Sequence, residues 1–209
     1  MELTSQEKEK YTHDFKETIL SYYKVSLESF ALIESIIVFR RVKKDEILLR
    51  EGQVAKHLHF ICKGAVIAFF SDEAGNMYNK NIFLEYQFAG SKVSAILKTP
   101  SKFTLQAIED TVLITIPYER YRELLNQDND LKNFYIAYLE KNWIIAKEQR
   151  EISIVMENAA VRYQKFLDAY PDIDKRIPLR HIASHLGITP TQLSRIRKEL
   201  KKDKHNQHM

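Results

Sequence analysis

The 209-residue sequence has little of what many catalytic and metal sites require. Its single cysteine, Cys62, excludes an internal disulfide framework, a two-cysteine metal knuckle and a four-cysteine iron–sulfur cluster, and it fits a reducing compartment. The sequence also lacks the glycine-rich phosphate-binding loop, the dinucleotide-binding fingerprint and the G-x-S-x-G nucleophile motif. We therefore expect no enzymatic activity, no metal and no cofactor.

Long apolar runs are absent as well. No stretch reaches the ~18 consecutive apolar residues that a membrane-spanning helix needs, and residues 1–10 lack the apolar core of a secretion signal. We expect a cytoplasmic protein with no membrane partner. Hydrophobic residues at 44% and charged residues at 29% are typical of a folded globular chain and argue against disorder.

Charge is unevenly distributed along the chain. The formal net charge is only +4, but the residues from Ala159 onward contain eleven Lys and Arg against five Asp and Glu. The preceding part contains 21 Lys and Arg against 23 Asp and Glu. A basic carboxy-terminal module on a near-neutral body is typical of a chain that binds a polyanion such as nucleic acid.

The amino-terminal part predicts an antiparallel β-roll or jelly roll, so the expected fold class is α+β. Residues 15–37 have apolar positions at helical spacing and predict short helical turns. Four of the five glycines lie between the short runs that follow, where turns need a positive φ. Those runs, rich in Val, Ile, Phe and Thr, predict strands at residues 36–42, 46–49, 57–62, 65–70, 77–84, 103–107 and 112–116.

A long helix is predicted after the roll. Asp128 begins a stretch that supplies an N-cap, and no helix-breaking residue occurs before the step from Tyr170 to Pro171. Within it, eight residues are spaced alternately four and three positions apart over nearly four heptads. This spacing predicts a seam between two copies of the helix in a homodimer, in which the polar seam residues fix the register of the pair. The seam residues are Leu131, Tyr135, Tyr138, Asn142, Ile145, Gln149, Ile152 and Met156. The alternative is a helix that only packs on the sheet of its own chain, through Phe134, Tyr138 and Trp143.

Residues 177–200 predict two short helices joined by a tight turn, which is a helix-turn-helix. Gly187 ends the first helix. Thr189, Pro190 and Gln192 then provide an N-cap, a first-turn proline and a capping-box side chain, so a second helix begins almost at once.

The second of these helices has two chemically different faces. Leu193, Ile196 and Leu200 share one face and are expected to be buried, whereas a hydroxyl and several cations lie opposite. Such cations neutralise phosphates, and Arg195 can make two parallel hydrogen bonds to guanine in the major groove. The predicted DNA-binding residues are Thr189, Thr191, Gln192, Ser194, Arg195, Lys198 and Lys202. The alternative is a basic, solvated helix pair without a nucleic-acid partner.

The sequence allows two alternative roles for each of two side chains of this helix. Gln192 is equally suited to pairing with adenine and to closing the capping box. Arg197 lies close to the apolar face, so a phosphate contact or packing at the edge is expected instead of base recognition.

Taken together, these features resemble the Crp/Fnr family of bacterial transcription regulators, and residues 166–200 are most similar to its Bacteroidetes-type members. The resemblance implies a cyclic nucleotide-binding-like effector domain in residues 1–127, a dimerisation helix in residues 128–158 and a DNA-binding helix-turn-helix domain in residues 159–209. It implies a homodimer that binds double-stranded DNA, with RNA polymerase as an expected partner. Family members read bases from positions that match Thr191 and Arg195.

Three departures from the family pattern matter. Members that bind cyclic AMP carry a Gly-Glu pair for the ribose and an Arg-Ser pair for the phosphate. The corresponding effector-pocket positions here are Gly90, Ser91, Ser101 and Lys102, so the carboxylate and the arginine are missing. Lys102 offers only a point charge in place of a bidentate fork. Pro190 stands where many members carry another base-reading side chain, and the β-wing that usually follows position 200 is expected to be absent.

The effector is therefore an unidentified small molecule or none, and cyclic AMP is not expected to bind. Two other functions stay open: a cyclic-nucleotide-gated regulator, and an effector-binding signalling module that acts on a protein partner and keeps the helix-turn-helix as a remnant. His57 and His59 share one face of a strand but lack further ligands, so we expect a structural role for them. His181 and His185 share a helix face, and we expect phosphate or packing contacts for them instead of zinc. Cys62 is expected to be a small buried hydrophobe.

Overall fold

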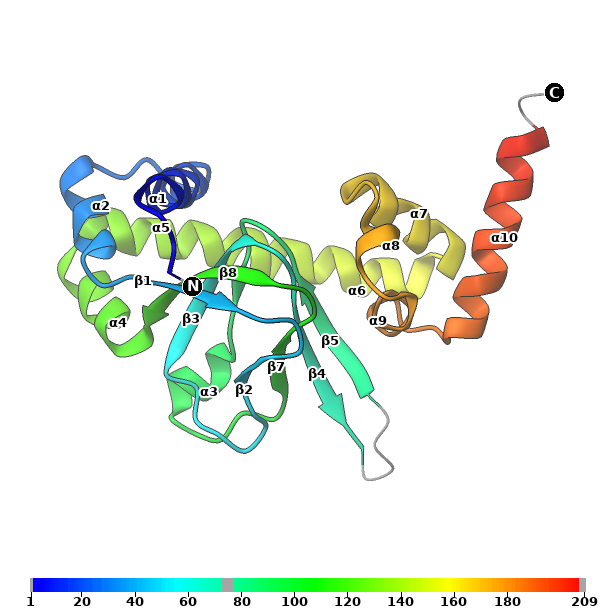
Figure 1. Cartoon of the computed structure of the whole chain (residues 1–209), viewed down its shortest axis with the longest axis horizontal. Helices are drawn as coiled ribbons and strands as arrows, with labels where there is room; N and C mark the ends of the chain where they lie inside the picture. The colour runs from blue at the N-terminus through cyan, green and yellow to red at the C-terminus, as the bar shows by residue number, and fades with distance from the viewer. Residues whose placement is uncertain (1, 73–76, 207–209) are drawn as a thin grey trace.

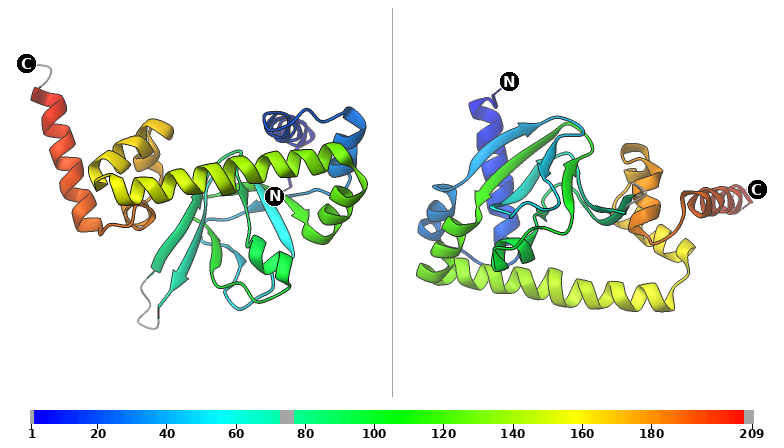
Figure 2. Two further views of the ribbon diagram at one scale, coloured as in Figure 1. Left: turned by 180° about the vertical axis from the view of Figure 1, so that it is seen from behind. Right: turned by 90° about the horizontal axis from the view of Figure 1, so that it is seen from below.

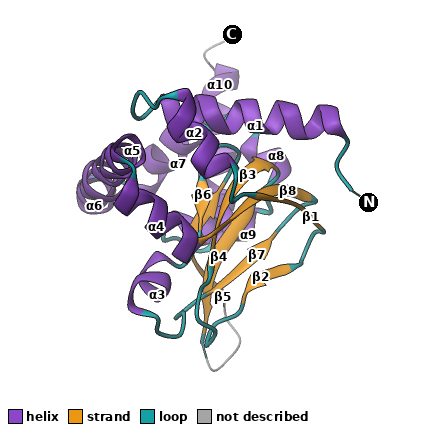
Figure 3. Cartoon of the chain, turned by 90° about the vertical axis from the view of Figure 1, so that its left-hand side faces the viewer, coloured by secondary structure: helices purple, strands orange, loops and turns teal. Residues whose placement is uncertain are grey.

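The structure is a computed structural model that describes residues 2–72 and 77–206 (Figure 1). It begins with two helices, α1 (Ser5–Leu20) and α2 (Leu27–Glu34), which lie over one end of a β-roll (Figure 3). α1 starts ten residues earlier than the predicted turns, because Thr4 and Glu7 form a capping box. Phe15 of α1 is fully buried, and its ring meets that of Phe60 in the roll edge-on at 5.0 Å between centroids.

The roll consists of two four-stranded antiparallel sheets, with strand orders β1-β8-β3-β6 and β2-β7-β4-β5. The strands are β1 (Val38–Val42), β2 (Ile47–Leu49), β3 (His57–Lys63), β4 (Val66–Ser71), β5 (Met77–Phe83), β6 (Phe88–Ala89), β7 (Thr104–Ala107) and β8 (Thr111–Pro117). All seven predicted strands are confirmed, with ends shifted by up to two residues. The sequence did not predict the two-residue strand β6 or the short helix α3 (Lys92–Leu97), because neither is long enough to show a periodicity.

A rod of helix runs along the side of the roll (Figure 2). After α4 (Tyr118–Gln127), which was not predicted, the rod comprises α5 (Asn129–Leu139), the π-helical segment η1 (Glu140–Ile145) and α6 (Ala146–Met156). Asp128 caps it as expected, since its carboxylate accepts a hydrogen bond from the amide of Leu131. The expectation of an unbroken helix as far as residue 170 is wrong, because Asn158 accepts from the amide of Val161 and starts a new helix.

Four helices form the carboxy-terminal module (residues 159–206): α7 (Ala159–Ala169), α8 (Ile173–Arg176), α9 (Leu179–His185) and α10 (Pro190–Asn206). α10 continues through position 200 as helix, so the described residues contain no β-wing there. The module is docked on the roll next to β5, and α10 projects from the end of the molecule (Figure 1). Ile67 and Ile82 of the sheet share one apolar core with Tyr163, Ile177 and Ile182 of the module.

Within the described residues, no helix is both long enough and apolar enough to cross a membrane.

Candidate functional site

The connection between α9 and α10 has the capping geometry that the sequence predicts. The hydroxyl of Thr189 accepts a hydrogen bond from the amide of Gln192 at 3.1 Å, and the Gln192 side-chain oxygen accepts from the amide of Thr189 at 2.9 Å. Gln192 is therefore occupied by the capping box in this structure. Gly187 has a φ of +70°, a conformation that glycine adopts without strain and that turns the chain out of α9.

α10 presents one face to the module and the other to solvent. Leu193 is fully buried, and Ile196 and Leu200 pack against the same core as partly buried side chains. The opposite face is exposed at Thr191, Ser194, Arg195, Lys198 and Lys202, and Thr189 and Gln192 are exposed at its beginning. The sequence-predicted residues are thus brought together on one accessible basic surface.

Arg197 belongs to a different environment. Its guanidinium donates to the Asp174 carboxylate at 2.9 Å, and both side chains are largely covered, with 27% and 20% of their surface exposed. Edge packing, one of the two predicted roles, describes this side chain. The ion pair ties α10 to α8, and it leaves Arg197 turned away from the exposed basic face.

Polar contacts that the sequence did not reveal hold the module on the roll. The amide of Asn79 in β5 donates to the Ser184 hydroxyl at 2.6 Å, and the Asn79 side-chain amide donates to the carbonyl oxygen of His181 at 3.0 Å. Arg176 forms a bidentate pair with Glu85, at 2.8 and 3.2 Å, and a further pair with Glu109 at 2.5 Å. Because these partners are about 70 to 105 residues apart in sequence, no local pattern could indicate them.

The predicted effector-pocket residues lie in two settings. Ser91 and Ser101 are both buried, and their hydroxyl oxygens lie 3.0 Å apart. Ser101 Oγ also lies 2.8 Å from the carbonyl oxygen of Phe103. The two serines therefore contact other protein groups. They occupy positions at which the resemblance to cyclic-AMP-binding proteins implied side chains that bind ribose and phosphate. Lys102 is exposed beside them. A Cβ on Gly90 would lie 2.8 Å from Leu58 Cδ2, so a larger residue at this position would require the Leu58 side chain to shift.

The structure contradicts the first half of the predicted dimer seam. Leu131 and Tyr138 are 0% and 8% exposed, and they lie in the core of their own chain together with Phe134. Asn142 also turns inward, because its amide donates to the hydroxyl oxygen of Tyr22 at 3.1 Å. This part of the rod follows the alternative, in which the helix packs on its own roll.

The second half of the seam has the opposite environment. Ile145, Ile152 and Met156 are 53%, 55% and 77% exposed, and Gln149 between them is exposed too. The π-helical segment η1 explains the difference, because its wider turn inserts about one extra residue into the α-helical register. Residues seven apart across η1 therefore lie on different faces. Tyr135 sits on the inner half, partly buried with its ring 6.0 Å from that of Tyr121.

Among residues 2–72 and 77–206, nothing supplies a third metal ligand to the histidine pair in the roll. His59 is buried, and its Nδ1 lies 3.1 Å from the Thr115 hydroxyl, while His57 is exposed beside it. Burial lowers the pKa of His59 to about 3, so this imidazole is neutral at physiological pH. Among the described residues, no group of three or more His, Cys, Asp or Glu side chains is placed to hold a metal ion. Cys62 is buried, as predicted.

Comparisons with known proteins bear on this arrangement. A family model for the cyclic nucleotide-binding domain matches residues 39–128. No curated protein matches the chain. One similar solved structure is that of the c-di-GMP responsive global regulator CLP of Xanthomonas campestris, with 17% identity and a TM-score of 0.64 over 85% of this chain and 93% of that chain.

Two further solved structures are similar. FixK2 of Bradyrhizobium japonicum has 18% identity and a TM-score of 0.65, over 80% of this chain and 86% of that chain. A protein of Eubacterium rectale, described as a transcriptional regulator of the crp/fnr family, has 20% identity and a TM-score of 0.61, over 86% and 85%. The similarity of residues 166–200 to Bacteroidetes-type members stays a prediction. Residues 39–128 thus match the model of the cyclic nucleotide-binding domain family, and the chain shares its fold with these three solved structures.

Proposed function

We propose that the protein is a sequence-specific DNA-binding transcription regulator that acts as a homodimer. In this proposal, residues 1–127 are the effector domain, residues 128–158 provide the dimerisation helix, and residues 159–209 are the helix-turn-helix domain. The observation that carries it is the exposed basic face of α10, anchored from behind by the buried side chain of Leu193. A helix in this setting can enter the major groove without displacing any part of its own fold.

The side chains on this face fit the two kinds of contact that DNA recognition needs. Lys198 and Lys202 are exposed cations that can neutralise phosphates, which supplies affinity for any duplex. Arg195 and Thr191 lie closer to the start of α10, the part of a recognition helix that meets base edges. Gln192 is held by the capping box, so base recognition by Gln192 requires that hydrogen bond to open.

Replacing Arg195 with alanine is expected to lower affinity for the selected operator about 10- to 100-fold, because a bidentate contact to guanine discriminates by about 1–3 kcal/mol. Lys202→Ala should instead weaken binding to all duplexes alike and make the salt dependence shallower by about one phosphate contact. Genomic fragments selected by the protein and mapped by footprinting supply the operator, and salt-titrated binding measures both variants.

The matched control is Lys175→Ala, which removes an exposed cation of the same module outside α10 and should leave the operator affinity within about twofold of the unaltered protein. Equal affinity of the unaltered protein for all duplexes would contradict sequence-specific regulation. It would favour the alternative of a signalling module that acts on a protein partner.

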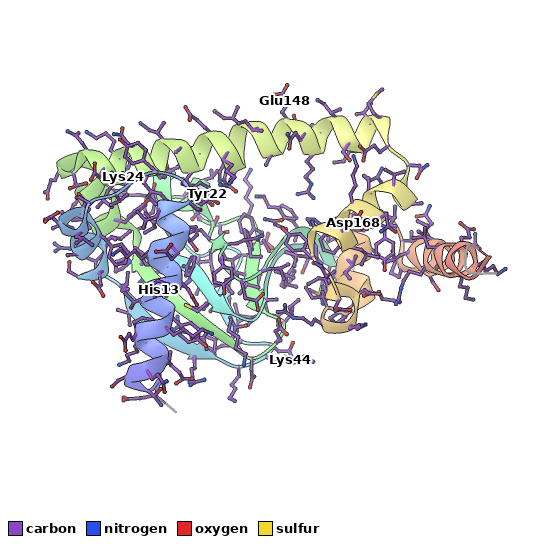
Figure 4. All side chains as sticks on the ribbon, turned by 90° about the horizontal axis from the view of Figure 1, so that it is seen from above. His13, Tyr22, Lys24, Lys44, Glu148 and Asp168 are labelled. Atoms are coloured by element: carbon purple, nitrogen blue, oxygen red, sulfur yellow. The ribbon has the colours of Figure 1, made fainter. Side chains whose placement is uncertain are left out.

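The exposed second half of the rod provides the dimer surface in this proposal. Ile145, Ile152 and Met156 form an apolar stripe, and Figure 4 shows the neighbouring Glu148 on the side of α6 that faces away from the rest of the chain. Two such stripes pairing across a twofold axis would bury them and place two copies of α10 for half-sites one helical turn apart.

Ile152→Asp is expected to convert the dimer to a monomer, because it places an unpaired carboxylate in the centre of the paired stripe. Ile154→Asp is the matched control. Ile154 is as exposed as Ile152, at 56% against 55%, but it lies on the opposite side of α6, where it faces the module. Sedimentation velocity measures both, and dissociation by the control alone would refute the assignment of the surface.

A further inference from the structure

A small cavity of about 220 Å³ lies where the end of the rod meets the carboxy-terminal module. Its walls come from α6, α7 and the end of α9, and in the part of the chain that the structure describes no residue of the roll lines it. It is therefore separate from the effector-pocket positions that the family resemblance indicated. The volume lies below the range of about 300–1,000 Å³ that is typical of sites for larger organic ligands, so it fits a small ion.

The cavity wall is positively charged. Arg150 of α6 and Arg162 and Lys165 of α7 line it, and among the residues that the structure describes no Asp or Glu does so. Glu157, which connects α6 to α7, forms an ion pair with Lys165 and is, within the described ranges, the only carboxylate paired with any of the three cations. Three positive charges against one negative charge leave a net charge of +2, which matches a divalent anion.

Backbone carbonyl oxygens hold both guanidinium groups in place. Arg162 Nη2 donates to the carbonyl oxygen of Leu186 at 3.1 Å, and its Nη1 donates to the carbonyl oxygen of Glu157. Arg150 Nη2 donates to the carbonyl oxygen of His185 at 3.2 Å. A guanidinium has five N–H donors, so each group keeps donors for a further acceptor. The protein thus fixes both groups at the cavity wall, which lowers the entropic cost of binding an anion there.

Two nitrogen atoms of the lining are buried without a hydrogen-bond partner among the described residues, Arg162 Nε and His185 Nδ1. Buried polar atoms in folded proteins are normally bonded, because an unsatisfied one costs free energy. Burial and the neighbouring Arg150 lower the pKa of His185 to about 4, so its ring is neutral at physiological pH and can carry its one proton on Nδ1. Each nitrogen then offers an N–H, and the oxygens of an anion supply the missing acceptors.

Apolar side chains complete the lining. Phe166 and Leu186 are buried beside the cations, each with 9% of its surface exposed. Apolar walls exclude water and lower the local dielectric constant, so a charge in the cavity interacts with the cations more strongly than it would on an open surface.

We infer that this cavity binds a small divalent oxyanion of the phosphate or sulfate class. Its oxygens accept hydrogen bonds from the side chains of Arg150, Arg162, Lys165 and His185. Because these side chains belong to α6, α7 and α9, a bound anion ties the end of the rod to the module across the connection at Glu157. It thereby fixes the angle between the rod and the module. The inference goes beyond the proposed function and does not depend on it, since its test uses no DNA.

Sulfate and inorganic phosphate are the probes, titrated at slightly alkaline pH, where both are divalent, against potassium chloride of equal ionic strength. We expect saturable heat in isothermal titration calorimetry with sulfate, phosphate or both, and a melting temperature that rises and then levels off. Both anions also stabilise proteins in general through exclusion from the surface, but that effect keeps growing with concentration. Saturation therefore identifies a site, and the tighter probe identifies the anion.

Variants locate the site. Lys165→Gln should weaken binding of the active probe about tenfold or more, because it removes a hydrogen bond between charged groups. His185→Phe keeps a ring beside Phe166 but removes the Nδ1 donor, so it should weaken binding several-fold. Arg162→Gln also breaks the two bonds to backbone carbonyls, so the other two variants carry the test.

Lys175→Gln is the matched control, because Lys175 is an exposed lysine of the same module outside the cavity lining, and it should bind as the unaltered protein does. The inference is overturned if neither sulfate nor phosphate shows saturable binding at about 10 mM. It is overturned as well if Lys165→Gln and His185→Phe both bind the active probe as tightly as Lys175→Gln.

Discussion

Leu193→Ala is expected to abolish specific DNA binding while the roll remains folded. Leu193 is fully buried, and α9 is the main element that α10 contacts. Removing a buried leucine side chain costs about 2–5 kcal/mol, a large share of what holds one terminal helix in place. Once α10 is no longer fixed, Thr191 and Arg195 lose the orientation that base recognition requires. Operator affinity and the far-ultraviolet circular dichroism melting curve measure the two effects.

Leu200→Ala provides the matched comparison on the same helix. Leu200 belongs to the same apolar face but is only partly buried, so its truncation should cost less and lower the operator affinity to a smaller extent. If Leu193→Ala binds the operator as tightly as the unaltered protein, then α10 does not act as an anchored recognition helix, and the proposed mode of DNA binding is wrong.

Capping signals were the most reliable guide from sequence to structure. Thr189 and Gln192 are three residues apart, and the geometry of a first helical turn makes each satisfy the backbone amide of the other. The exposed and buried faces of α10 followed from 100° per residue alone. Both depend on interactions within a few residues, which a sequence displays directly.

The dimer seam shows where a periodic pattern misleads. The spacing of residues 131–156 is heptad throughout, but a seam requires a constant helical register as well as a constant spacing. The π-helical turn of η1 breaks that register, and nothing in residues 140–145 marks it in the sequence. In the amino-terminal half of the pattern, Leu131 and Tyr138 are buried in the core of their own chain. Only the carboxy-terminal half has exposed side chains that a partner could contact.

The contacts that dock the module on the roll were beyond the reach of sequence analysis for a different reason. Arg176 is one of the 32 Lys and Arg of the chain, and its partners Glu85 and Glu109 lie far from it in sequence. Asn79 is one of several polar residues in β5, whose burial does not alternate regularly. Their roles exist only once the module packs against β5, which is a consequence of tertiary structure that no local pattern encodes.

Acidification is expected to release the module from the roll between about pH 6.5 and pH 4. His181 is 5% exposed, and its Nδ1 lies 3.1 Å from the side-chain nitrogen of Asn79. Only a neutral imidazole can accept at that nitrogen, because a protonated ring would turn a second donor toward the amide. Burial, together with Arg180, lowers the pKa of His181 to about 4, and burial, together with Arg150, does the same for His185.

The direction of the effect follows from the two pKa values. A free histidine titrates at about 6.5, so between pH 6.5 and pH 4 the undocked state binds more protons than the docked state. The neutral histidines therefore stabilise docking fully above pH 6.5, and this stabilisation is lost as the pH falls toward 4. For His181 the loss is on the order of 3 kcal/mol at most, which is enough to shift a marginal docking equilibrium.

Hydrogen exchange of the Asn79 amide, which donates to Ser184 of α9, measures this release at each pH. His181→Gln keeps an acceptor opposite Asn79 but does not titrate, so its docking should depend less on pH than that of the unaltered protein. His13→Gln changes an exposed histidine of α1 (Figure 4) and should leave the profile unchanged. His185 of α9 titrates in both variants, so a residual slope is expected. A profile that His181→Gln does not flatten would show that the Asn79–His181 contact does not control docking, and the acid sensitivity would then arise from other histidines.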